Sequence, residues 1–197
     1  MIEIDRSIAA GDVLTVMGPS GVGKSTLLAL ITGTLPPAFT GMGQILLDGR
    51  DITNTPPHKR HIGILFQDDL LFPHMSVGAN LAFGMPRGGG KSERQAKIAE
   101  ALCDVDLEGY ADRDPATLSG GQKARVALAR MLLSNPRALL LDEAFSRLDA
   151  ELRAQVRALV FQTAKDRALP VLMVTHDAED AAAAGGEIIE LKSLSNS

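Results

Sequence analysis

Apolar residues occur along this chain in two patterns, as short continuous runs and as longer stretches with helical spacing. Short aliphatic runs are typical of strands buried in a parallel sheet, and they occur at 12–17, 44–48, 61–66, 138–141 and 171–175. Helical spacing occurs at 24–31, 92–103 and 150–165. This alternation predicts an α/β fold with a mainly parallel sheet. The run at 44–48 ends in Asp48-Gly49, which predicts a turn and a short antiparallel β part.

The region from 68 to 135 differs from the rest because its pattern is mostly helical. After Ser119, apolar residues keep the spacing i, i+3, i+4, i+7, i+8 of one buried helix face. They are Ala124, Ala127, Leu128, Met131 and Leu132. We therefore expect a single domain over 1–197, in which a core (1–67 and 136–197) is interrupted by a helical subdomain (68–135).

Composition and charge narrow the class of protein. A formal net charge of −4 provides no basic surface for nucleic acid or anionic lipid. No apolar run reaches the roughly 18 residues that span a bilayer, and the N-terminal segment lacks the basic start and apolar stretch of a signal peptide. We therefore expect a cytoplasmic protein with no nucleic-acid partner. The single cysteine, Cys103, fits a reducing compartment and is expected to be a small buried residue.

A glycine-rich segment between the first predicted strand and the first predicted helix fits the pattern G-x-x-x-x-G-K-[ST]. It comprises Gly18, Pro19, Ser20, Gly21, Val22, Gly23, Lys24, Ser25 and Thr26. Glycines let such a loop wrap closely, so that backbone N–H groups point at phosphate oxygens, and the helix N-terminus adds partial positive charge. We expect Lys24 to reach the β- and γ-phosphates and the Ser25 hydroxyl to bind Mg²⁺. The segment therefore predicts a P-loop that binds ATP.

Two acidic residues end the apolar run at 138–141. Side chains of neighbouring strand residues point in opposite directions, so Asp142 and Glu143 are expected to have different roles. Asp142 is expected to face the P-loop and bind Mg²⁺ through water, and Glu143 to polarise the attacking water. Many strands end in solvated acids, but the presence of a P-loop in the same chain favours the catalytic interpretation.

A second glycine-rich segment precedes the helical face described above. It consists of Leu118, Ser119, Gly120, Gly121 and Gln122. A serine hydroxyl and exposed N–H groups at a helix N-terminus form an anion-binding site, whereas the structural alternative is an ordinary serine N-cap. The sequence LSGGQ, about 20 residues before Asp142, resembles the signature of ABC (ATP-binding cassette) ATPases. The resemblance covers about residues 5–191.

Further motifs of that family follow in the same order. Gln67 resembles the Q-loop glutamine that senses Mg²⁺ and the γ-phosphate, and His176 resembles the switch histidine that contacts the γ-phosphate. The segment that resembles the D-loop is Ser146, Arg147, Leu148 and Asp149. The resemblance implies a P-loop NTPase (RecA-like) core that uses ATP and Mg²⁺. The residues that it implies for metal binding are Ser25, Gln67 and Asp142, and those for catalysis are Glu143, His176 and Lys24.

The family resemblance also implies partners. In such proteins each ATP is clamped between the P-loop of one cassette and the signature of another, so a second copy or a paralogous cassette is expected. The segment 64–77 looks like importer ATPases of the thiamine, molybdate, iron and polyamine systems. This implies integral membrane permease subunits, a substrate-binding protein and a position on the cytoplasmic face of the inner membrane. Leu70, Leu71 and Phe72 are expected either to form part of a groove for the permease or to pack in the core.

Two features depart from the family pattern. Family members stack an aromatic residue on adenine, whereas this chain has no aromatic residue before Phe39, which predicts weak base selectivity. Ala144 stands where importers usually have proline, which is expected to loosen the turn after Glu143. The leading hypothesis is an ATPase subunit that drives solute transport, with import favoured. The alternatives are a soluble ABC ATPase without a transport role and a cassette that binds nucleotide but hydrolyses it poorly.

Overall fold

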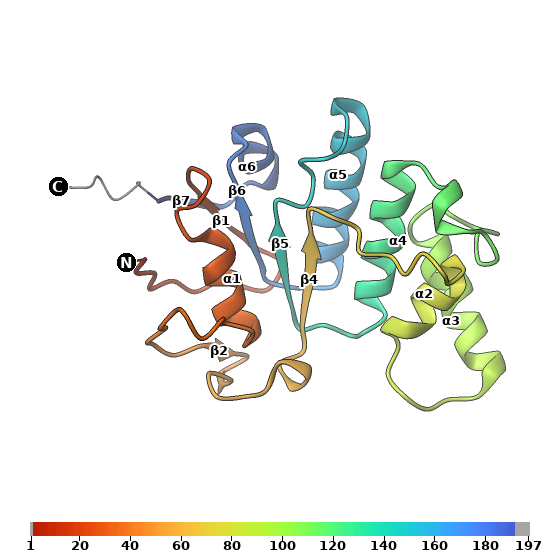
Figure 1. The fold of residues 1–197 in the computed structure, drawn as a ribbon, viewed down its shortest axis with the longest axis horizontal. Helices are drawn as coiled ribbons and strands as arrows, with labels where there is room; N and C mark the ends of the chain where they lie inside the picture. Colours follow the sequence, from red (N-terminus) through yellow and green to blue (C-terminus); the bar gives the residue numbers. More distant parts are fainter. Residues whose placement is uncertain (1, 192–197) are drawn as a thin grey trace.

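Five parallel strands form the central sheet of the protein, for which a computed structural model describes residues 2–191 (Figure 1). Their order in the sheet is β4 (Ile62–Phe66), β5 (Ala138–Asp142), β6 (Val171–Thr175), β1 (Val13–Met17) and β7 (Glu187–Glu190). Every adjacent pair is parallel. The predicted α/β fold is therefore confirmed, and the carboxyl ends of β5, β6 and β1 lie next to one another at one edge of the sheet.

A second, two-stranded sheet is antiparallel. β2 (Leu46–Leu47) pairs with β3 (Arg50–Asp51) across the turn Asp48-Gly49. Both turn residues have positive φ, 49° and 74°, which is the conformation that two-residue hairpin turns favour. The predicted antiparallel part is confirmed, although its first strand is shorter than the apolar run at 44–48.

Six α-helices and two 3-10 turns connect the strands within the described residues. The helices are α1 (Lys24–Thr32), α2 (Val77–Gly84), α3 (Lys91–Cys103), α4 (Gly120–Leu132), α5 (Ala150–Asp166) and α6 (Ala178–Ala184), and the turns are η1 (Pro57–Lys59) and η2 (Pro115–Thr117). Helices α2, α3 and α4 gather beside the β4 edge of the sheet, away from β7 (Figure 1). Among residues 2–191, no helix has both the length and the apolar character needed to cross a lipid bilayer.

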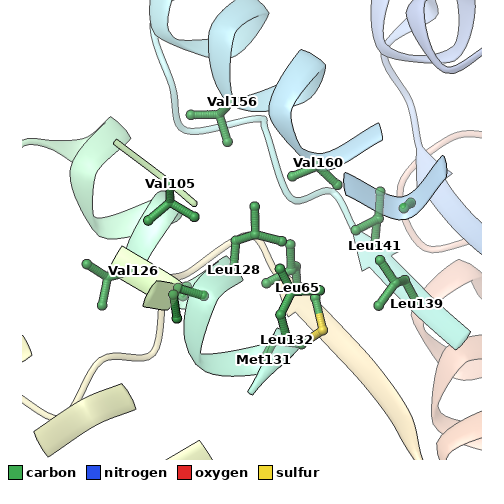
Figure 2. Packing of buried hydrophobic residues seen from close by; sticks show 14 of the residues in the cluster. Leu65, Val105, Val126, Leu128, Met131, Leu132, Leu139, Leu141, Val156 and Val160 are labelled. Carbon is green, nitrogen blue, oxygen red and sulfur yellow. The ribbon is translucent and has the colours of Figure 1, made fainter. Parts of the chain in front are cut away.

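The strand β5 shows how both faces of the sheet are covered. Leu139 and Leu141 are buried in one cluster and Leu140 in another, as the alternation of side chains along a strand requires. The first cluster joins the sheet to α4 and α5 (Figure 2), and its members include Leu65, Leu128, Met131, Leu132, Val156 and Val160. The second cluster joins the opposite face to α1 through Leu28.

The apolar face predicted for α4 is buried in the first cluster, with Ala124 only partly covered. Because α4 packs on β4 and α5, and its buried face belongs to the same cluster as Leu139 and Leu141, the helical region shares one hydrophobic core with the sheet. The position of the N-terminus of α4 is therefore set by the sheet. The division into a core (1–67 and 136–197) and a helical subdomain (68–135) stays a prediction.

Cys103 is exposed, which contradicts the prediction that it is a small buried residue. It is the last residue of α3 and follows Leu102, which is buried. Consecutive residues of an α-helix are about 100° apart around its axis. Ala101 and Leu102 are both buried, and Cys103, about 200° from Ala101 around the helix axis, lies outside that buried face.

Candidate active site

Most of the predicted catalytic residues gather at the edge of the sheet where β1, β5 and β6 end. The phosphate loop follows β1, and His176 follows β6. Asp142 ends β5, where it lies opposite Val174 of β6, and Glu143 comes next in the chain. A crevice at the carboxyl ends of neighbouring parallel strands is where open α/β sheets bind their ligands.

The phosphate loop leads into a helix N-terminus without a side-chain cap. Gly23 is the N-cap residue of α1, with a left-handed φ of 107°, and no side chain in the described part of the chain caps this end. A Cβ atom at Gly23 would lie only 2.8 Å from Cδ1 of Ile2. By contrast, Ser119 caps α4 and Asp149 caps α5 through their side chains. The free N–H groups of α1 therefore fit a phosphate group.

Lys24 is buried beneath this loop and is only 4% exposed. Its Nζ donates to the carbonyl oxygens of Gly18 at 2.8 Å and Pro19 at 3.1 Å. It also lies 3.5 Å from Oε1 of Glu143. Burying an ammonium group is costly unless it is paired, and here two carbonyl groups and one carboxylate hold it. The amine is thus fixed between the phosphate loop and the acidic end of β5.

Ser25 and Asp142 form the part of the site that fits Mg²⁺. The Ser25 hydroxyl donates to Oδ1 of Asp142 at 3.1 Å. Burial raises the pKa of Asp142, and this effect together with the neighbouring Glu143 outweighs the Ser25 hydrogen bond and Lys24. A divalent cation would compensate that buried charge. Residues 2–191 contain no cluster of three His, Cys, Asp or Glu side chains that could hold a metal. Mg²⁺ in ATP sites is held by few protein oxygens together with phosphates.

Gln67, the third predicted metal contact, lies at the margin of this site. It follows Phe66, which lies opposite Asp142 in the sheet, so its backbone reaches the same edge. Its side chain is exposed and makes no hydrogen bond to any other residue that the structure describes. The contact of Gln67 with a metal therefore stays a prediction.

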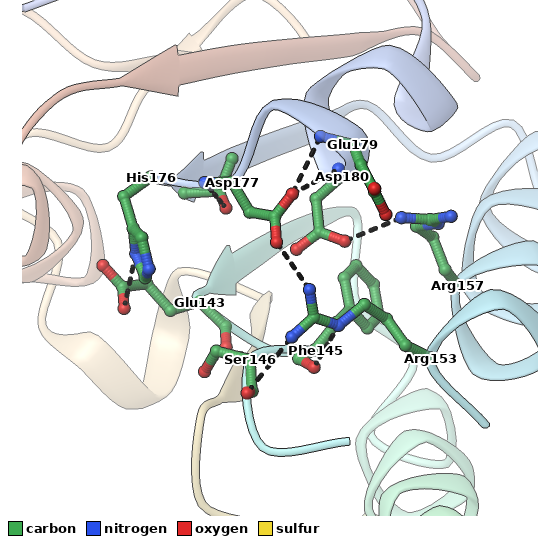
Figure 3. Close-up of polar contacts among 10 residues, drawn as sticks. Glu143, Phe145, Ser146, Arg153, Arg157, His176, Asp177, Glu179 and Asp180 are labelled. Atoms are coloured by element: carbon green, nitrogen blue, oxygen red, sulfur yellow. Dashed lines mark hydrogen bonds and ion pairs between the residues drawn. The ribbon is translucent and has the colours of Figure 1, made fainter. Parts of the chain in front are cut away.

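Glu143 connects the phosphate loop with the end of β6. Its Oε2 lies 3.3 Å from Nδ1 of His176 (Figure 3), while its other oxygen lies 3.5 Å from Nζ of Lys24. Glu143 has left β5 and lies in the left-handed region, with φ of 49°. This backbone conformation, rather than strand alternation, gives the two carboxylates different partners on the phosphate loop.

The signature residues lie at the N-terminus of α4, apart from the phosphate loop. Ser119 accepts from the N–H of Gln122 at 3.3 Å, and Oε1 of Gln122 accepts from the N–H of Ser119 at 2.9 Å, which completes a capping box. The Gln122 amide also donates to the hydroxyl of Tyr110 at 3.2 Å. Ser119 and Gly120 are exposed. Within the described residues, no hydrogen bond joins this motif to the phosphate loop of the same chain.

The first half of the D-loop bonds to segments that carry other site residues. The hydroxyl of Ser146 donates to the carbonyl oxygen of Glu143 at 2.8 Å. Arg147 forms an ion pair with Asp68, the residue that follows the predicted Q-loop glutamine. Both side chains of this pair are exposed, so it contributes little to stability.

The second half of the D-loop lies beside the signature. A Cβ atom at Gly120 would lie 3.6 Å from Leu148, and one at Gly121 would lie 2.9 Å from Leu152 of α5. Asp149 caps α5 by accepting from the N–H of Leu152 at 3.0 Å. The D-loop therefore lies between the signature motif and the segment that carries the proposed catalytic base.

A polar cluster that the sequence did not predict surrounds the segment after Glu143 (Figure 3). Arg153 of α5 donates to the carbonyl oxygens of Phe145 at 3.1 Å and Ser146 at 3.2 Å. It also donates to Oδ2 of Asp177 at 2.5 Å, across 24 residues of sequence. A single arginine in a predicted helix does not form a recognisable sequence motif. The packing of α5 places Arg153 beside the turn after Glu143.

Comparison with protein families matches residues 2–146 to the model described as ABC transporter. The chain belongs to the ABC transporter family. This cassette is 47% identical over 180 residues to an uncharacterized ABC transporter ATP-binding protein, YnjD, of Escherichia coli K12, a match that covers 91% of this chain and 83% of the relative. The resemblance carried by the LSGGQ motif is thereby confirmed.

Other relatives have named roles. The cassette is 44% identical over 188 residues to the Fe(3+) ions import ATP-binding protein FbpC 1 of Haemophilus influenzae, and 45% over 181 residues to the spermidine/putrescine import ATP-binding protein PotA of Nitrosomonas europaea. These matches cover 95% and 91% of this chain but 56% and 49% of the relatives, so the chain spans about half the length of those import proteins.

A solved structure agrees with the fold. The dimeric structure of MJ0796, a bacterial ABC transporter cassette, matches with a TM-score of 0.77 and 31% sequence identity, over 95% of this chain and 84% of that one. The P-loop NTPase fold with an ABC-type arrangement is therefore confirmed. The roles of the individual site residues stay predictions.

Because the pKa of Asp142 is raised, we expect that replacing this residue with a neutral one stabilises the protein but lowers its ATP turnover. The pKa of the Asp142 carboxyl group is higher in the folded than in the unfolded protein, so folding favours its neutral form. The free energy of unfolding therefore falls as pH rises from the unfolded-state pKa through the folded-state pKa. We therefore expect Asp142→Asn to melt at the same or a higher temperature than wild type without nucleotide. Its Mg²⁺-dependent ATP turnover is expected to fall about 100-fold or more. Thermal unfolding and phosphate release measure the two effects, with the exposed Asp104→Asn as control; full turnover in Asp142→Asn contradicts the metal role.

Proposed function

We propose that this cassette binds ATP with Mg²⁺ at its phosphate loop and hydrolyses it to drive solute import through a membrane permease. The observation that carries the proposal is the position of the Glu143 carboxylate, 3.5 Å from Nζ of Lys24 and 3.3 Å from Nδ1 of His176. Phosphoryl transfer to water requires a group that orients the water and fixed positive charge around the phosphates. This arrangement provides both.

Each group at the edge of the sheet has its own task in this proposal. Lys24 and the N–H groups of α1 bind phosphate oxygens, and the carboxylate of Glu143 orients a water and accepts its proton. His176 lies 3.3 Å from that carboxylate and is proposed to contact the γ-phosphate. Ser25 and Asp142 would hold Mg²⁺, which supplies charge compensation when it is bound.

A second cassette completes the site in this proposal. Ser119 and Gly120 are exposed at the N-terminus of α4 and, within the part of the chain that the structure describes, make no hydrogen bond to their own phosphate loop. The Ser119 oxygen accepts within its own cap, but its hydroxyl proton and the exposed helix N-terminus can bind an anion. We propose that this helix N-terminus closes over ATP held by the phosphate loop of a second copy or of a paralogous cassette. The related cassette MJ0796 is described as dimeric, which supports this pairing.

The proposed contact surface for the permease is an apolar patch beside β4, formed by the exposed Leu70 and Phe83 and the partly buried Phe72. Leu70 and Phe83 are 56% and 65% exposed, and the rings of Phe72 and Phe83 are 4.6 Å apart with an edge-to-face orientation. Leu71 instead packs against the core, as the second alternative for this segment expected, whereas a permease contact of Leu70 and Phe72 stays a proposal. Apolar side chains that gather at a surface mark interaction sites.

The direction of transport rests on the relatives. FbpC 1 and PotA carry names of iron and spermidine/putrescine import, which supports import over the alternative of a soluble ATPase without a transport role. We propose that the cassette works on the cytoplasmic face of the inner membrane and that a substrate-binding protein delivers the solute. The contacts of the Glu143 carboxylate with Lys24 and His176 support hydrolysis over the alternative of a cassette that hydrolyses poorly.

Capture of partners from membranes tests the transport role. Tagged Glu143→Gln protein is expected to retain a polytopic membrane protein from gently solubilised native membranes, identified by mass spectrometry. Adding Phe83→Asp is expected to reduce that recovery about tenfold or more, because it places a charge in an apolar contact. Phe39→Asp is the matched control, since Phe39 is 52% exposed and lies outside the patch. Recovery of ribosomes, or of nothing from the membrane, contradicts the transport role, and equal losses in both variants contradict the patch.

A further inference from the structure

One guanidinium group joins the two chain segments that carry Glu143 and His176 (Figure 3). Nε and Nη2 of Arg153 donate to the carbonyl oxygens of 145 and 146 at 3.1 and 3.2 Å. Nη1 of the same side chain donates to Oδ2 of Asp177 at 2.5 Å. These contacts reach two or three residues beyond Glu143 on one side and the residue directly after His176 on the other. The planar fork of arginine suits such a set of fixed acceptors.

The two carboxylate oxygens of Asp177 bind different partners. Oδ1 accepts from the N–H groups of Glu179 at 2.8 Å and Asp180 at 3.3 Å and so caps α6, while Oδ2 binds Arg153. Burial acts to raise the pKa of Asp177, but the two N–H groups and the guanidinium prevail and hold it below its usual value. The charged carboxylate therefore fixes the backbone next to His176 from both sides.

The turn after Glu143 has an apolar anchor and a polar one. The ring of Phe145 is buried and lies 5.9 Å from the ring of Phe161 of α5. The carbonyl oxygens on the other side of the turn are bound by Arg153. Because Ala144 does not restrict the backbone as proline would, the direction of this turn depends on its contacts, and the Arg153 side chain is the contact that also binds Asp177 beside His176.

We infer that Arg153 is a positioning residue that sets the spacing between the Glu143 carboxylate and the His176 imidazole; the inference rests on the proposed ATPase function. It touches neither of those side chains and acts through the backbone that carries them. A displacement of about 1 Å at reacting groups can lower a rate about 100-fold. Loss of Arg153 is therefore expected to reduce turnover more than it reduces nucleotide binding or stability.

Arg157 provides a matched control one turn further along α5 (Figure 3). Its Nη1 lies 2.9 Å from Oδ1 of Asp180, and this pair is more buried than the pair of Arg153 with Asp177. Within the described residues, Arg157 makes no hydrogen bond to the turn after Glu143. Breaking either pair removes one partly buried arginine from the same helix, but only Arg153 also binds the turn after Glu143.

The test compares kcat, the KM for ATP and the melting temperature of Arg153→Met and Arg157→Met. Arg153→Met is expected to lose kcat about 100-fold with KM changed by less than about threefold. Arg157→Met is expected to lower the melting temperature at least as much, yet keep kcat within about threefold of wild type. Arg153→Lys, which keeps the charge opposite Asp177 but lacks the fork, is expected to restore part of the lost kcat.

Equal losses of kcat in Arg153→Met and Arg157→Met overturn the inference, because a purely structural role predicts that result. If Arg153→Met does not fold, Asp177→Asn replaces it, since asparagine retains an acceptor for the cap of α6 but loses the charge that binds Arg153. Asp177→Asn is then expected to lower kcat about tenfold with little change in KM, and an unchanged kcat overturns the inference. Absence of turnover in wild type, or full turnover in Glu143→Gln, contradicts the proposed ATPase function and with it this role of Arg153.

Discussion

Glu143→Gln is expected to lower the steady-state ATP turnover of this cassette about 10³-fold while ATP binding stays near the wild-type level. Glutamine has nearly the same size as glutamate, so the phosphate loop and Lys24 keep their positions. The amide cannot accept a proton from water, and loss of a general base typically costs about 10² to 10⁴ in rate. Phosphate release at saturating ATP measures the turnover, and the affinity for a fluorescent ATP analogue measures binding.

The same variant is expected to accumulate as an ATP-bound dimer. If ATP joins the phosphate loop of one cassette to the signature of another, a cassette that cannot hydrolyse it keeps the two together. Size-exclusion chromatography with light scattering, in the presence of ATP or ADP, distinguishes the dimer from the monomer. Glu108→Gln, in an exposed position, is the control and is expected to behave like wild type. Normal turnover in Glu143→Gln excludes Glu143 as the base.

The parts of the site that the sequence predicted are those that a local pattern specifies. The phosphate loop, the two acids at the end of β5 and His176 each stand at the end of an apolar run, and parallel strands bring such ends to one edge. These residues meet because β5, β6 and β1 are neighbours in the sheet, in that order. For the same reason the apolar face of α4 was predictable, because its spacing specifies which side is buried.

The parts that the sequence did not predict depend on backbone conformation or on long-range contacts. The left-handed φ of Glu143 gives its carboxylate a partner on the phosphate loop different from that of Asp142. No propensity of glutamate favours that conformation. Arg153 and Asp177 are 24 residues apart, and each belongs to a residue type that is common on helix surfaces and caps. The exposure of Cys103 likewise follows from the direction of a neighbouring residue rather than from its own type.

The signature motif illustrates a third situation, in which the sequence predicts a function that one chain cannot perform alone. Ser119 and Gln122 cap α4 in a manner that the sequence allowed as the structural alternative. The cap uses the serine oxygen as an acceptor, so the proton of the hydroxyl remains available for another group. The structural and functional interpretations of this motif are therefore compatible.

Lys24→Ala is expected to weaken ATP binding about 30- to 1000-fold, which is the opposite pattern to that of Glu143→Gln. The amine of Lys24 is the one buried cation that the described residues place in the phosphate loop. A hydrogen bond to a charged group contributes about 1.5–3 kcal/mol, and Lys24 is proposed to bind both the β- and the γ-phosphate. Removing it also leaves Glu143 without its cation, so the negative charge of the site repels the nucleotide.

Equilibrium binding of ATP by calorimetry, with Mg²⁺, measures the effect of Lys24→Ala. Lys97→Ala is the matched control, because Lys97 is exposed and pairs only with Glu93 one turn away on α3; its affinity is expected to stay at the wild-type value. Thermal unfolding without nucleotide is expected to change little, since Gly18 and Pro19 lie near the surface and water can replace the amine at their carbonyl oxygens. Normal ATP affinity in Lys24→Ala would place the phosphates elsewhere and contradict the site, because every other role assigned to this edge of the sheet depends on phosphates held beside Lys24.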